Sequence, residues 1–381
     1  MRIIIAPDSF KGCLSAFEAA SAMEEGIRRV FPQAHLIKVP IADGGEGTVQ
    51  ALVSATSGQM RQLTVTGPLG RPVEAFWGIL GDGRTGAVEM ASASGLPLVS
   101  EEERNPCLTT TRGTGELVRA VLDAGLERLI LGIGGSATND GGAGFARALG
   151  ARFLDASGDE VPEGGASLVN VQRIDLSGMD GRLHNLEILV ACDVDNPLCG
   201  LRGASAVFGP QKGATPDMVE RLDAALSRFA EAAEEATGRD VAQTAGAGAA
   251  GGLGAGLLFF TNANLRPGVE IVLKAVNFEE LAGSADFIVT GEGNTDFQTA
   301  CGKAPVGVAQ AAKRHGKPVV CVSGGLGKGW RDVLEKGIDM VVPCPAAPMT
   351  LRECMAQGFG MVSDAAERAA KLIAVGMGLV K

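Results

Sequence analysis

The sequence of 381 residues lacks several residue types that would point to common classes of function. It contains no Tyr and only two Trp, so we expect no aromatic platform on which bases of single-stranded nucleic acid could stack. The net charge of −10 argues further against nucleic acid or an anionic membrane as a partner. Only three His are present, and the eight Cys form no C-x-x-C pair, which argues against a zinc site or a disulfide framework.

Long apolar runs are also missing. No stretch of about 18 apolar residues occurs, and the chain opens with a strand-like segment rather than a signal peptide. We therefore expect a soluble cytoplasmic protein. Apolar residues make up 46% of the chain and charged residues 20%, which indicates buried cores rather than disorder, and the length favours two domains over one.

Glycine, in contrast, is abundant, with 55 residues, about twice the usual share. It gathers in loops between predicted strands and helices. The chain begins with strands at 2–6 and 35–40, each followed by a helix, and a capping box of Ser15 and Glu18 opens the first helix. Such alternation predicts a parallel sheet with right-handed crossovers. A predicted hairpin near residues 62–80 then interrupts the alternation.

The same alternation returns late in the chain, and a last helix is predicted over residues 351–376. We therefore predict an α/β fold with two domains. A parallel-sheet, Rossmann- or flavodoxin-like domain is built from both chain ends, residues 1–69 and 285–381. An inserted α/β domain with a mixed sheet covers residues 70–284. We expect the active site in the cleft between the two domains, where ligands commonly bind.

Residues 129–150 carry the most informative pattern. An apolar run, predicted as a strand, leads into a glycine-rich loop and then into a short helix that Asn139 or Asp140 could cap. A loop of this kind offers backbone N–H groups and the positive end of the helix dipole to a phosphate. We therefore assign to phosphate binding the loop residues Gly134, Gly135, Ser136, Thr138 and Asn139.

Five other loops carry the residue types that phosphoryl transfer needs. That reaction requires cations on the phosphates, carboxylates for Mg²⁺ and a group that orients the attacking hydroxyl. Most of these loops follow predicted strands, whose carboxyl ends are where α/β sheets bind ligands. The candidates are Asp8, Ser9, Lys11, Asp43, Asp193, Asp195, Asn196, Lys212, Glu292, Asp296, Gln298 and Lys303.

Ordinary structural roles explain some candidates taken singly. Asp8 or Asp43 alone is typical of a turn or a helix cap, and Lys212 alone is typical of a solvated position. Asp193, Asp195 and Asp296 are stronger candidates because their neighbours are small or amide residues with no obvious capping pattern.

Two nucleotide-binding signatures can be tested directly. The P-loop pattern is absent. A G-x-G-x-x-G match begins at Gly246, but no convincing strand precedes it, and we interpret the tract as a closely packed helix entry.

Eight short motifs follow one another along essentially the whole chain. They are APDSFKG at 6–12, DGGEGT at 43–48, GIGGSATNDGG at 132–142, CDVDNPLCG at 192–200, FGPQKGA at 208–214, GAGAAGGLG at 246–254, TGEG at 290–293 and GKAP at 302–305. Taken together, these ordered motifs resemble the bacterial glycerate kinase family. The resemblance implies two α/β domains and Mg-ATP-dependent phosphorylation of D-glycerate.

Three positions depart from the pattern of similar proteins. Those usually carry Ser where Cys13 stands, an aromatic residue where Arg112 stands and Arg where Asn294 stands. Asn294 in place of Arg removes a cation beside the expected site. Arg112 or Lys303 could replace that cation.

The resemblance also guides the expected roles. ATP phosphates are placed on residues 134–139 and Lys212, and Lys11 on the transferred phosphoryl group or the substrate carboxylate. Asp193 or Asp296 would orient or deprotonate the substrate hydroxyl. The expected Mg²⁺ ligands are Asp195, Asp43 and Glu292, and the expected substrate-binding residues are Asp8, Ser9, Asn196, Gln298 and Lys303.

The 2-hydroxyl of glycerate is the expected acceptor, as in bacterial members of the family, and a homodimer is possible. Two other functions stay open from the residues alone. One is an NAD(P)-dependent oxidoreductase of a small hydroxy acid. The other is a non-catalytic protein that senses a phosphorylated metabolite.

Overall fold

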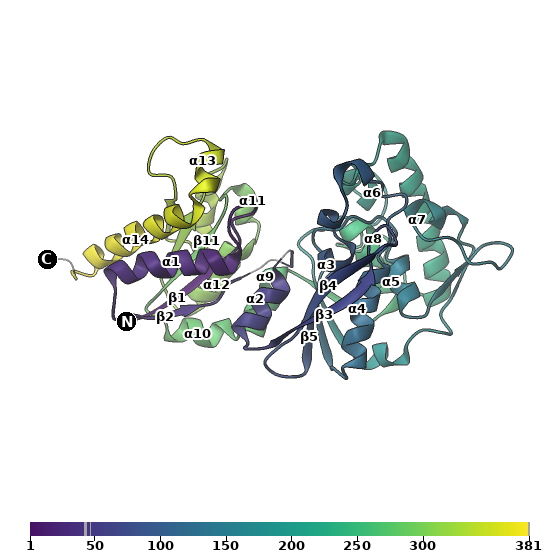
Figure 1. Cartoon of the computed structure of the whole chain (residues 1–381), viewed down its shortest axis with the longest axis horizontal. Helices are drawn as coiled ribbons and strands as arrows, with labels where there is room; N and C mark the ends of the chain where they lie inside the picture. Colours follow the sequence, from purple (N-terminus) through teal and green to yellow (C-terminus); the bar gives the residue numbers. More distant parts are fainter. Residues whose placement is uncertain (42–43, 46, 380–381) are drawn as a thin grey trace. The chain divides into compact units, whose positions relative to one another are not determined.

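The structure, a computed structural model, describes residues 1–41, 44–45 and 47–379. The chain divides into two compact units (Figure 1). Unit 1 comprises Met1–Asp43, Ser54–Thr56 and Val269–Lys381, and unit 2 comprises Gly44–Val53 and Ser57–Gly268. These units differ from the predicted domains in grouping residues 44–53 and 57–69 with unit 2 and residues 269–284 with unit 1. The predicted domain boundaries and the predicted cleft stay predictions.

Unit 1 contains a five-stranded sheet in which every pair of neighbours is parallel. The strand order is β13-β12-β11-β1-β2, and Ile3 of β1 lies in register with Phe287 and Leu36 of its neighbours. Numbered along the chain, this order is 2-1-3-4-5, the flavodoxin-like arrangement, whose strand order reverses between β1 and β11. The predicted parallel sheet is confirmed. Its strands are β1 Arg2–Pro7, β2 His35–Lys38, β11 Phe287–Glu292, β12 Val319–Ser323 and β13 Met340–Pro343.

Helices cover this sheet. Apolar residues of α1 and α14 share one core with the strands, whereas α10 and α12 contact β1 and α12 also contacts β11. The predicted capping box is confirmed, because Ser15 and Glu18 bond each other's backbone at the start of α1. The helices are α1 Ala16–Val30, α9 Gly268–Ala275, α10 Phe278–Ser284, α11 Phe297–Ala300, α12 Ala304–Arg314, α13 Leu351–Ala356 and α14 Gly358–Gly376.

The last predicted helix is in fact two helices, which are separated at Gln357. Glycines at positions 358 and 360 weaken continuous helix here. A Cβ on Gly358 would lie 2.2 Å from Cys13 Sγ, so this close approach requires glycine at the break.

Unit 2 contains a six-stranded mixed sheet with the order β10-β9-β6-β5-β4-β3. β10, β9, β6 and β5 run parallel, and β5, β4 and β3 run antiparallel, so the predicted mixed sheet and its hairpin are confirmed. A separate hairpin of β7 and β8, and the edge strand β10, were too short to predict. The strands are β3 Gln59–Thr66, β4 Pro72–Ile79, β5 Thr85–Glu89, β6 Arg128–Gly132, β7 Arg152–Leu154, β8 Arg173–Asp175, β9 Glu187–Ala191 and β10 Asn264–Arg266.

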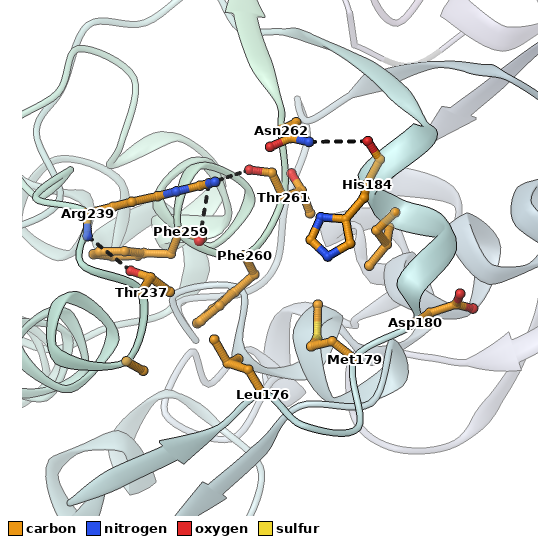
Figure 2. A pocket seen from close by; sticks show the side chains of 12 residues that line it. Leu176, Met179, Asp180, His184, Thr237, Arg239, Phe259, Phe260, Thr261 and Asn262 are labelled. Atoms are coloured by element: carbon orange, nitrogen blue, oxygen red, sulfur yellow. Dashed lines mark hydrogen bonds between the residues drawn. The ribbon is translucent and has the colours of Figure 1, made fainter.

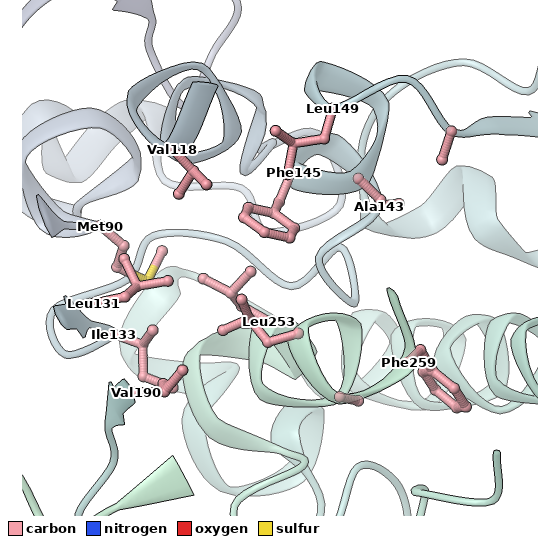
Figure 3. Close-up of a cluster of buried hydrophobic side chains, with 14 of the residues drawn as sticks. Met90, Val118, Leu131, Ile133, Ala143, Phe145, Leu149, Val190, Leu253 and Phe259 are labelled. Carbon is pink, nitrogen blue, oxygen red and sulfur yellow. The ribbon is translucent and has the colours of Figure 1, made fainter. Parts of the chain in front are cut away.

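The core of unit 2 joins the sheet to helices α4, α5, α7 and α8. Figure 3 shows Phe145 of α5 and Leu149, which directly follows α5, near Val118 of α4, with Leu253 of α8 toward Leu131 of β6. The helices are α2 Thr48–Ala55, α3 Ala91–Ser94, α4 Arg112–Asp123, α5 Ala143–Ala148, α6 Ala204–Phe208, α7 Pro216–Thr237 and α8 Ala249–Phe260. Within the described ranges, no helix is both long and apolar enough to span a bilayer.

Candidate active site

The glycine-rich loop of unit 2 joins the end of β6 to the start of α5, as predicted. Gly134 and Gly135 are exposed, whereas Thr138 and Asn139 have no exposed surface and Ser136 is 8% exposed. Gly135 has a φ of +75°, a conformation that favours glycine. Only the first part of the predicted phosphate loop therefore faces solvent.

Asp140 occupies the N-terminus of α5. Its Oδ2 accepts hydrogen bonds from the Thr111 backbone at 2.8 Å, the Thr111 hydroxyl at 2.9 Å and the Gly144 N–H at 3.2 Å, and its Oδ1 accepts one from the Gly142 N–H at 3.2 Å. This confirms the predicted capping by Asp140. Because the protein's own carboxylate fills this position, the helix terminus is not open to a phosphate, which corrects that part of the prediction. Burial raises the pKa of Asp140.

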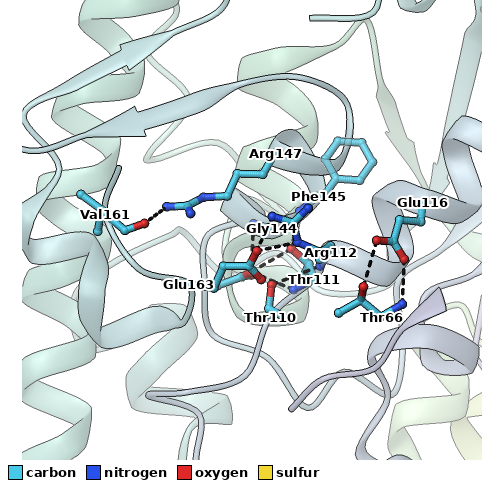
Figure 4. A network of polar contacts seen from close by, with 11 residues as sticks. Thr66, Thr110, Thr111, Arg112, Glu116, Gly144, Phe145, Arg147, Val161 and Glu163 are labelled. Carbon is cyan, nitrogen blue, oxygen red and sulfur yellow. Dashed lines mark hydrogen bonds and ion pairs between the residues drawn. The ribbon is translucent and has the colours of Figure 1, made fainter. Parts of the chain in front are cut away.

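Neighbouring polar groups hold α5 in the same place. Figure 4 shows Thr111, whose hydroxyl oxygen accepts a hydrogen bond from the Phe145 N–H at 2.9 Å. It also shows Arg112 paired with Glu163. The Arg112 guanidinium is thus already paired within unit 2, and its predicted replacement of the cation at Asn294 stays a prediction.

The glycine tract of α8 packs directly behind the loop. A Cβ on Gly251 would lie 1.9 Å from the carbonyl oxygen of Thr138, and one on Gly256 would lie 2.5 Å from that of Gly141. This confirms the predicted close packing. The tract follows helix α7 rather than a strand, so it does not form the strand-loop-helix unit that a dinucleotide requires.

Lys212 is buried beside the loop, with 2% of its surface exposed. Its Nζ donates hydrogen bonds to Ser136 Oγ and to the carbonyl oxygen of Thr138, both at 2.7 Å. The interpretation of Lys212 as a solvated residue is therefore wrong. Burial lowers the pKa of Lys212 to about 7, although Asp140 opposes this shift.

Two polar atoms next to this lysine have no partner among the described residues. They are Thr138 Oγ1 and Asn139 Oδ1, and both are buried. The amide nitrogen of Asn139 is satisfied, because it donates to Ser205 Oγ at 3.0 Å. Such unsatisfied groups are uncommon in buried positions, so the pair marks a place where a ligand or ordered water can bond.

The acidic loop after β9 lies at the same carboxyl edge of the unit 2 sheet. Asp193 Oδ1 accepts a hydrogen bond from the Gly268 N–H at 2.9 Å. Asp195 is exposed and pairs with Arg202 at 3.0 Å, and Asn196 donates to the Arg202 carbonyl at 2.8 Å. Arg202 thus holds both predicted neighbours in place.

In unit 1 the predicted loops meet where the strand order reverses. The Asp8 N–H donates to the Gly291 carbonyl at 2.8 Å, and the Asp8 carboxylate accepts the Ser9 N–H at 2.6 Å. A Cβ on Gly293 would lie 3.4 Å from the backbone nitrogen of Lys11, so the loops after β1 and β11 are adjacent. The structure therefore brings Asp8, Ser9 and Lys11 together with the loop that begins at Gly291.

Glu292 is buried at the end of β11, with 6% of its surface exposed. Its Oε1 accepts a hydrogen bond from Thr299 Oγ1 at 2.7 Å. Burial raises the pKa of Glu292, and the nearby Lys303 partly offsets this. Lys303 donates to Gln298 Oε1 at 3.1 Å, and its predicted replacement of a cation at position 294 stays a prediction.

Asp296 caps the short helix α11. Its carboxylate accepts the Gln298 N–H at 2.9 Å and the Asn294 amide at 3.0 Å, and Thr299 Oγ1 accepts the Asp296 N–H in return. The prediction that Asp296 has no capping role is wrong. The usual capping-box pattern has Glu or Gln in the fourth position, so a box that ends in Thr escaped it.

One acid at the carboxyl edge of the unit 2 sheet was missed. Glu89 ends β5, and its carboxylate accepts the Val49 N–H at 2.5 Å and the Gly47 N–H at 3.2 Å at the start of α2. An acid that closes an apolar strand was the available signal.

Among the described residues, no three His, Cys, Asp or Glu side chains gather so as to hold a metal ion. Asp43, one predicted ligand, lies outside the described residues. Mg²⁺ in kinases is commonly bound by one or two carboxylates together with the phosphates of the substrate. Asp195 and Glu292 fit this chemistry, because each could supply one carboxylate to Mg²⁺ while the substrate phosphates supply further oxygens.

Unit 2 also has a separate pocket of about 300 Å³, which contains none of the predicted site residues. Figure 2 shows the rings of Phe259 and Phe260 and the side chain of His184 along it. Arg239 lies at its side and donates to the Thr261 carbonyl at 2.5 Å, which satisfies the end of α8.

Comparisons with known proteins agree over the full length. The sequence profile of the glycerate kinase family matches residues 3–374. A glycerate kinase of Bacillus subtilis is 54% identical over 381 residues, which cover 100% of this chain and 99% of that protein. A glycerate 2-kinase of Escherichia coli is 50% identical, with 99% of each chain covered. The crystal structure of a putative glycerate kinase 2 from Salmonella typhimurium matches with a TM-score of 0.90 at 50% identity and covers 100% of both chains.

Proposed function

The chain belongs to the glycerate kinase family and is a kinase of glycerate, and from this premise we propose that it transfers the γ-phosphoryl group of ATP to the 2-hydroxyl of D-glycerate. The choice of hydroxyl is supported by the Escherichia coli relative, which is named a glycerate 2-kinase and shares 50% of its residues with this chain. The observation that carries the proposal is the full-length family match, joined to polar loops at the carboxyl ends of the strands in both sheets.

In unit 2 we assign the ATP phosphates to the exposed start of the glycine-rich loop. Gly134, Gly135 and Ser136 form this part, with Lys212 behind it. Thr138 and Asn139 stay proposed contacts through their unsatisfied oxygens. Phosphoryl transfer depends mainly on such fixed hydrogen-bond donors and cationic charge.

In unit 1 we assign the substrate to the loops that meet at the strand-order reversal. Lys11 would bind the transferred phosphoryl group or the glycerate carboxylate, as an exposed cation at the ligand edge of the sheet. The substrate-binding residues we propose are Asp8, Ser9, Gln298 and Lys303 here and Asn196 in unit 2.

Asp193 and Asp296 are the proposed groups that orient the attacking hydroxyl or accept its proton. Asp195, Asp43 and Glu292 are the proposed ligands of Mg²⁺, which when bound neutralises charge on the phosphates. The raised pKa of Glu292 reflects its burial, and a nearby cation would favour its ionised form. The cytoplasmic location and the homodimer stay predictions.

An ADP-release assay across small hydroxy acids tests the activity, with the product position read by phosphorus NMR. We expect turnover with D-glycerate and a phosphorus signal coupled to the C2 hydrogen. The proposal would be contradicted if none of the tested acids caused release of ADP. A product phosphorylated at C3 would also contradict it.

Two substitutions test the proposed bases. Asp193→Asn and Asp296→Asn should each lower kcat by about 10²–10⁴-fold, the usual contribution of a positioned base. Asp180→Asn is the matched control, since Asp180 also caps a short helical segment, through the Arg182 N–H. If Asp296→Asn changes stability as the control does but leaves kcat intact, Asp296 is a helix cap and not the base.

A further inference from the structure

Lys212 stands out because its ammonium group is buried without a bonded carboxylate among the described residues. Its Nζ is held by two neutral oxygens, Ser136 Oγ and the Thr138 carbonyl, both at 2.7 Å. Burial of a charged group is costly unless the group is well bonded. A lysine kept in this position needs a role that offsets the cost.

The contact with Lys212 restricts the Ser136 hydroxyl. A hydroxyl has one hydrogen to donate and two lone pairs that accept. Lys212 occupies one lone pair and has no lone pair of its own when charged, so the Ser136 hydrogen must donate to another group. Ser136 follows the exposed Gly134 and Gly135, at the edge of the part of the loop that reaches solvent.

The second contact fixes the backbone of the same segment. Lys212 binds the carbonyl oxygen of Thr138, two residues beyond Ser136, so one side chain ties both ends of residues 136–138. From the other side, Gly251 approaches the same Thr138 carbonyl so closely that no Cβ fits. The segment is therefore held from two sides, by Lys212 and by Gly251.

We propose that Lys212 is a positioning residue that makes Ser136 a fixed hydrogen-bond donor to a nucleotide phosphate, and that phosphate binding in turn holds a proton on Lys212. This inference rests on the proposed function, which places the ATP phosphates on this loop. Lys212 acts through Ser136 and does not itself contact the phosphate. A chain of hydrogen bonds that starts at a cation polarises the terminal donor and strengthens it.

The charges around Lys212 set the direction of the proton linkage. Asp140, from the far end of the loop, is the charged side chain that acts on it, and Arg104 approaches the adjacent Gly213 through its backbone and Cβ. With its pKa lowered to about 7, Lys212 is largely neutral at pH 8. A phosphate brought to Ser136 adds negative charge, which favours the protonated amine, so binding takes up a proton.

Calorimetry measures this uptake directly. The non-hydrolysable analogue AMP-PNP with magnesium is titrated into the whole protein at pH 8, in buffers of different ionisation enthalpy. Wild-type protein should take up about half a proton or more per site, whereas uptake should vanish at pH 5.5, where Lys212 is already charged.

Variants separate the linkage from a merely structural role. Lys212→Met should abolish uptake at pH 8 and weaken the analogue roughly 10- to 100-fold, the usual range for a charge-assisted hydrogen bond. Lys336→Met, at an exposed lysine, is the control and should change neither quantity. Ser136→Ala keeps the lysine and should reduce both uptake and affinity, which tests the idea even if Lys212→Met fails to fold.

Three outcomes would count against the proposal. Unchanged proton uptake in Lys212→Met or in Ser136→Ala would overturn it while leaving the proposed function intact. Full affinity in Ser136→Ala would show that Ser136 is not the donor. Wild-type protein that binds no nucleotide would overturn the proposed function, and this inference with it.

Discussion

The two units hold their candidate phosphate-binding groups in different ways. In unit 2 two polar side chains of the glycine-rich loop are buried and bonded to neighbouring elements, Asp140 to Thr111 and Ser136 to Lys212. In unit 1 the corresponding loops keep Lys11 and Gln298 exposed.

This difference predicts that substitutions in the two units have different effects on folding and on binding. A loop whose donors are fixed before the ligand arrives stabilises charge without reorganisation, but its residues also contribute to folding stability. Exposed long side chains add little to stability and lose conformational freedom only when they bind. Substitutions of the buried loop residues in unit 2 should therefore affect folding first, and substitutions of the exposed side chains Lys11 and Gln298 in unit 1 should affect binding alone.

The largest effect is expected at Asp140. Asp140→Ala leaves four buried donors of Thr111, Gly142 and Gly144 without an acceptor, so the free energy of unfolding should fall by roughly 3–5 kcal/mol. Urea denaturation measures it. Asp155→Ala is the control, because Asp155 accepts two backbone hydrogen bonds in an exposed turn and should cost about 1 kcal/mol or less. Equal losses in the two variants would erase the contrast between a buried and an exposed cap.

A methyl group added to the packed glycine tract should come next. Gly251→Ala places a Cβ 1.9 Å from the Thr138 carbonyl at a φ of +67°, and we expect a loss of roughly 2–4 kcal/mol with a weaker Kd for ATP. Gly83→Ala has nearly the same φ, +68°, but open space around it, so about 1 kcal/mol should be lost and binding should not change. If the two variants behave alike, backbone conformation and not packing explains the glycine.

The buried lysine predicts a pH dependence of stability. The pKa of Lys212 falls from 10.5 to about 7 on folding, so in this window the unfolded chain holds a proton that the folded chain lacks. The stability contributed by this group is therefore lost as the pH falls from 10.5 toward 7, at up to about 1.4 kcal/mol per pH unit. The difference in stability between wild type and Lys212→Met, measured by denaturation from pH 6 to 9.5, should rise above pH 7. A flat difference would show that Lys212 titrates normally.

The smallest effect is expected in unit 1. Asn294→Arg restores the cation found in similar proteins at an exposed position, so stability should change by no more than about 0.5 kcal/mol. At low salt the KM for ATP or for D-glycerate should fall by up to about fivefold. At high salt it should return toward the wild-type value, because salt screens exposed charges. A drop in Tm without a change in KM would contradict the expectation that substitutions of exposed residues in unit 1 affect binding and not folding.

The sequence was sufficient for the fold but not for the side-chain geometry. Hydrophobic periodicity and capping residues predicted the parallel and mixed sheets, and Ser15 and Glu18 fixed the start of α1. Short elements such as β10 carry too few residues for a pattern. The break at Gln357 depends on the packing of Gly358 against Cys13, a contact between distant parts of the chain.

For the candidate site, the motifs located the loops but did not reveal which groups are already used. Asp296 looks like a free carboxylate in the sequence, yet it caps helix α11. Lys212 looks solvated next to Gln211 and Gly213, yet it is buried. Burial and hydrogen-bond partners come from tertiary packing, which a local pattern does not contain.

The pairing of β1 with β11 has a consequence for how the protein is made. Ile3 lies beside Phe287, so β1 has no partner on one side until 284 more residues have been synthesised. At about 5–20 residues per second, this takes roughly 15–60 s. The edge of the apolar segment Ile3–Ala6 that pairs with β11 stays unpaired during that time, and incompletely paired apolar segments of this kind are prone to aggregation.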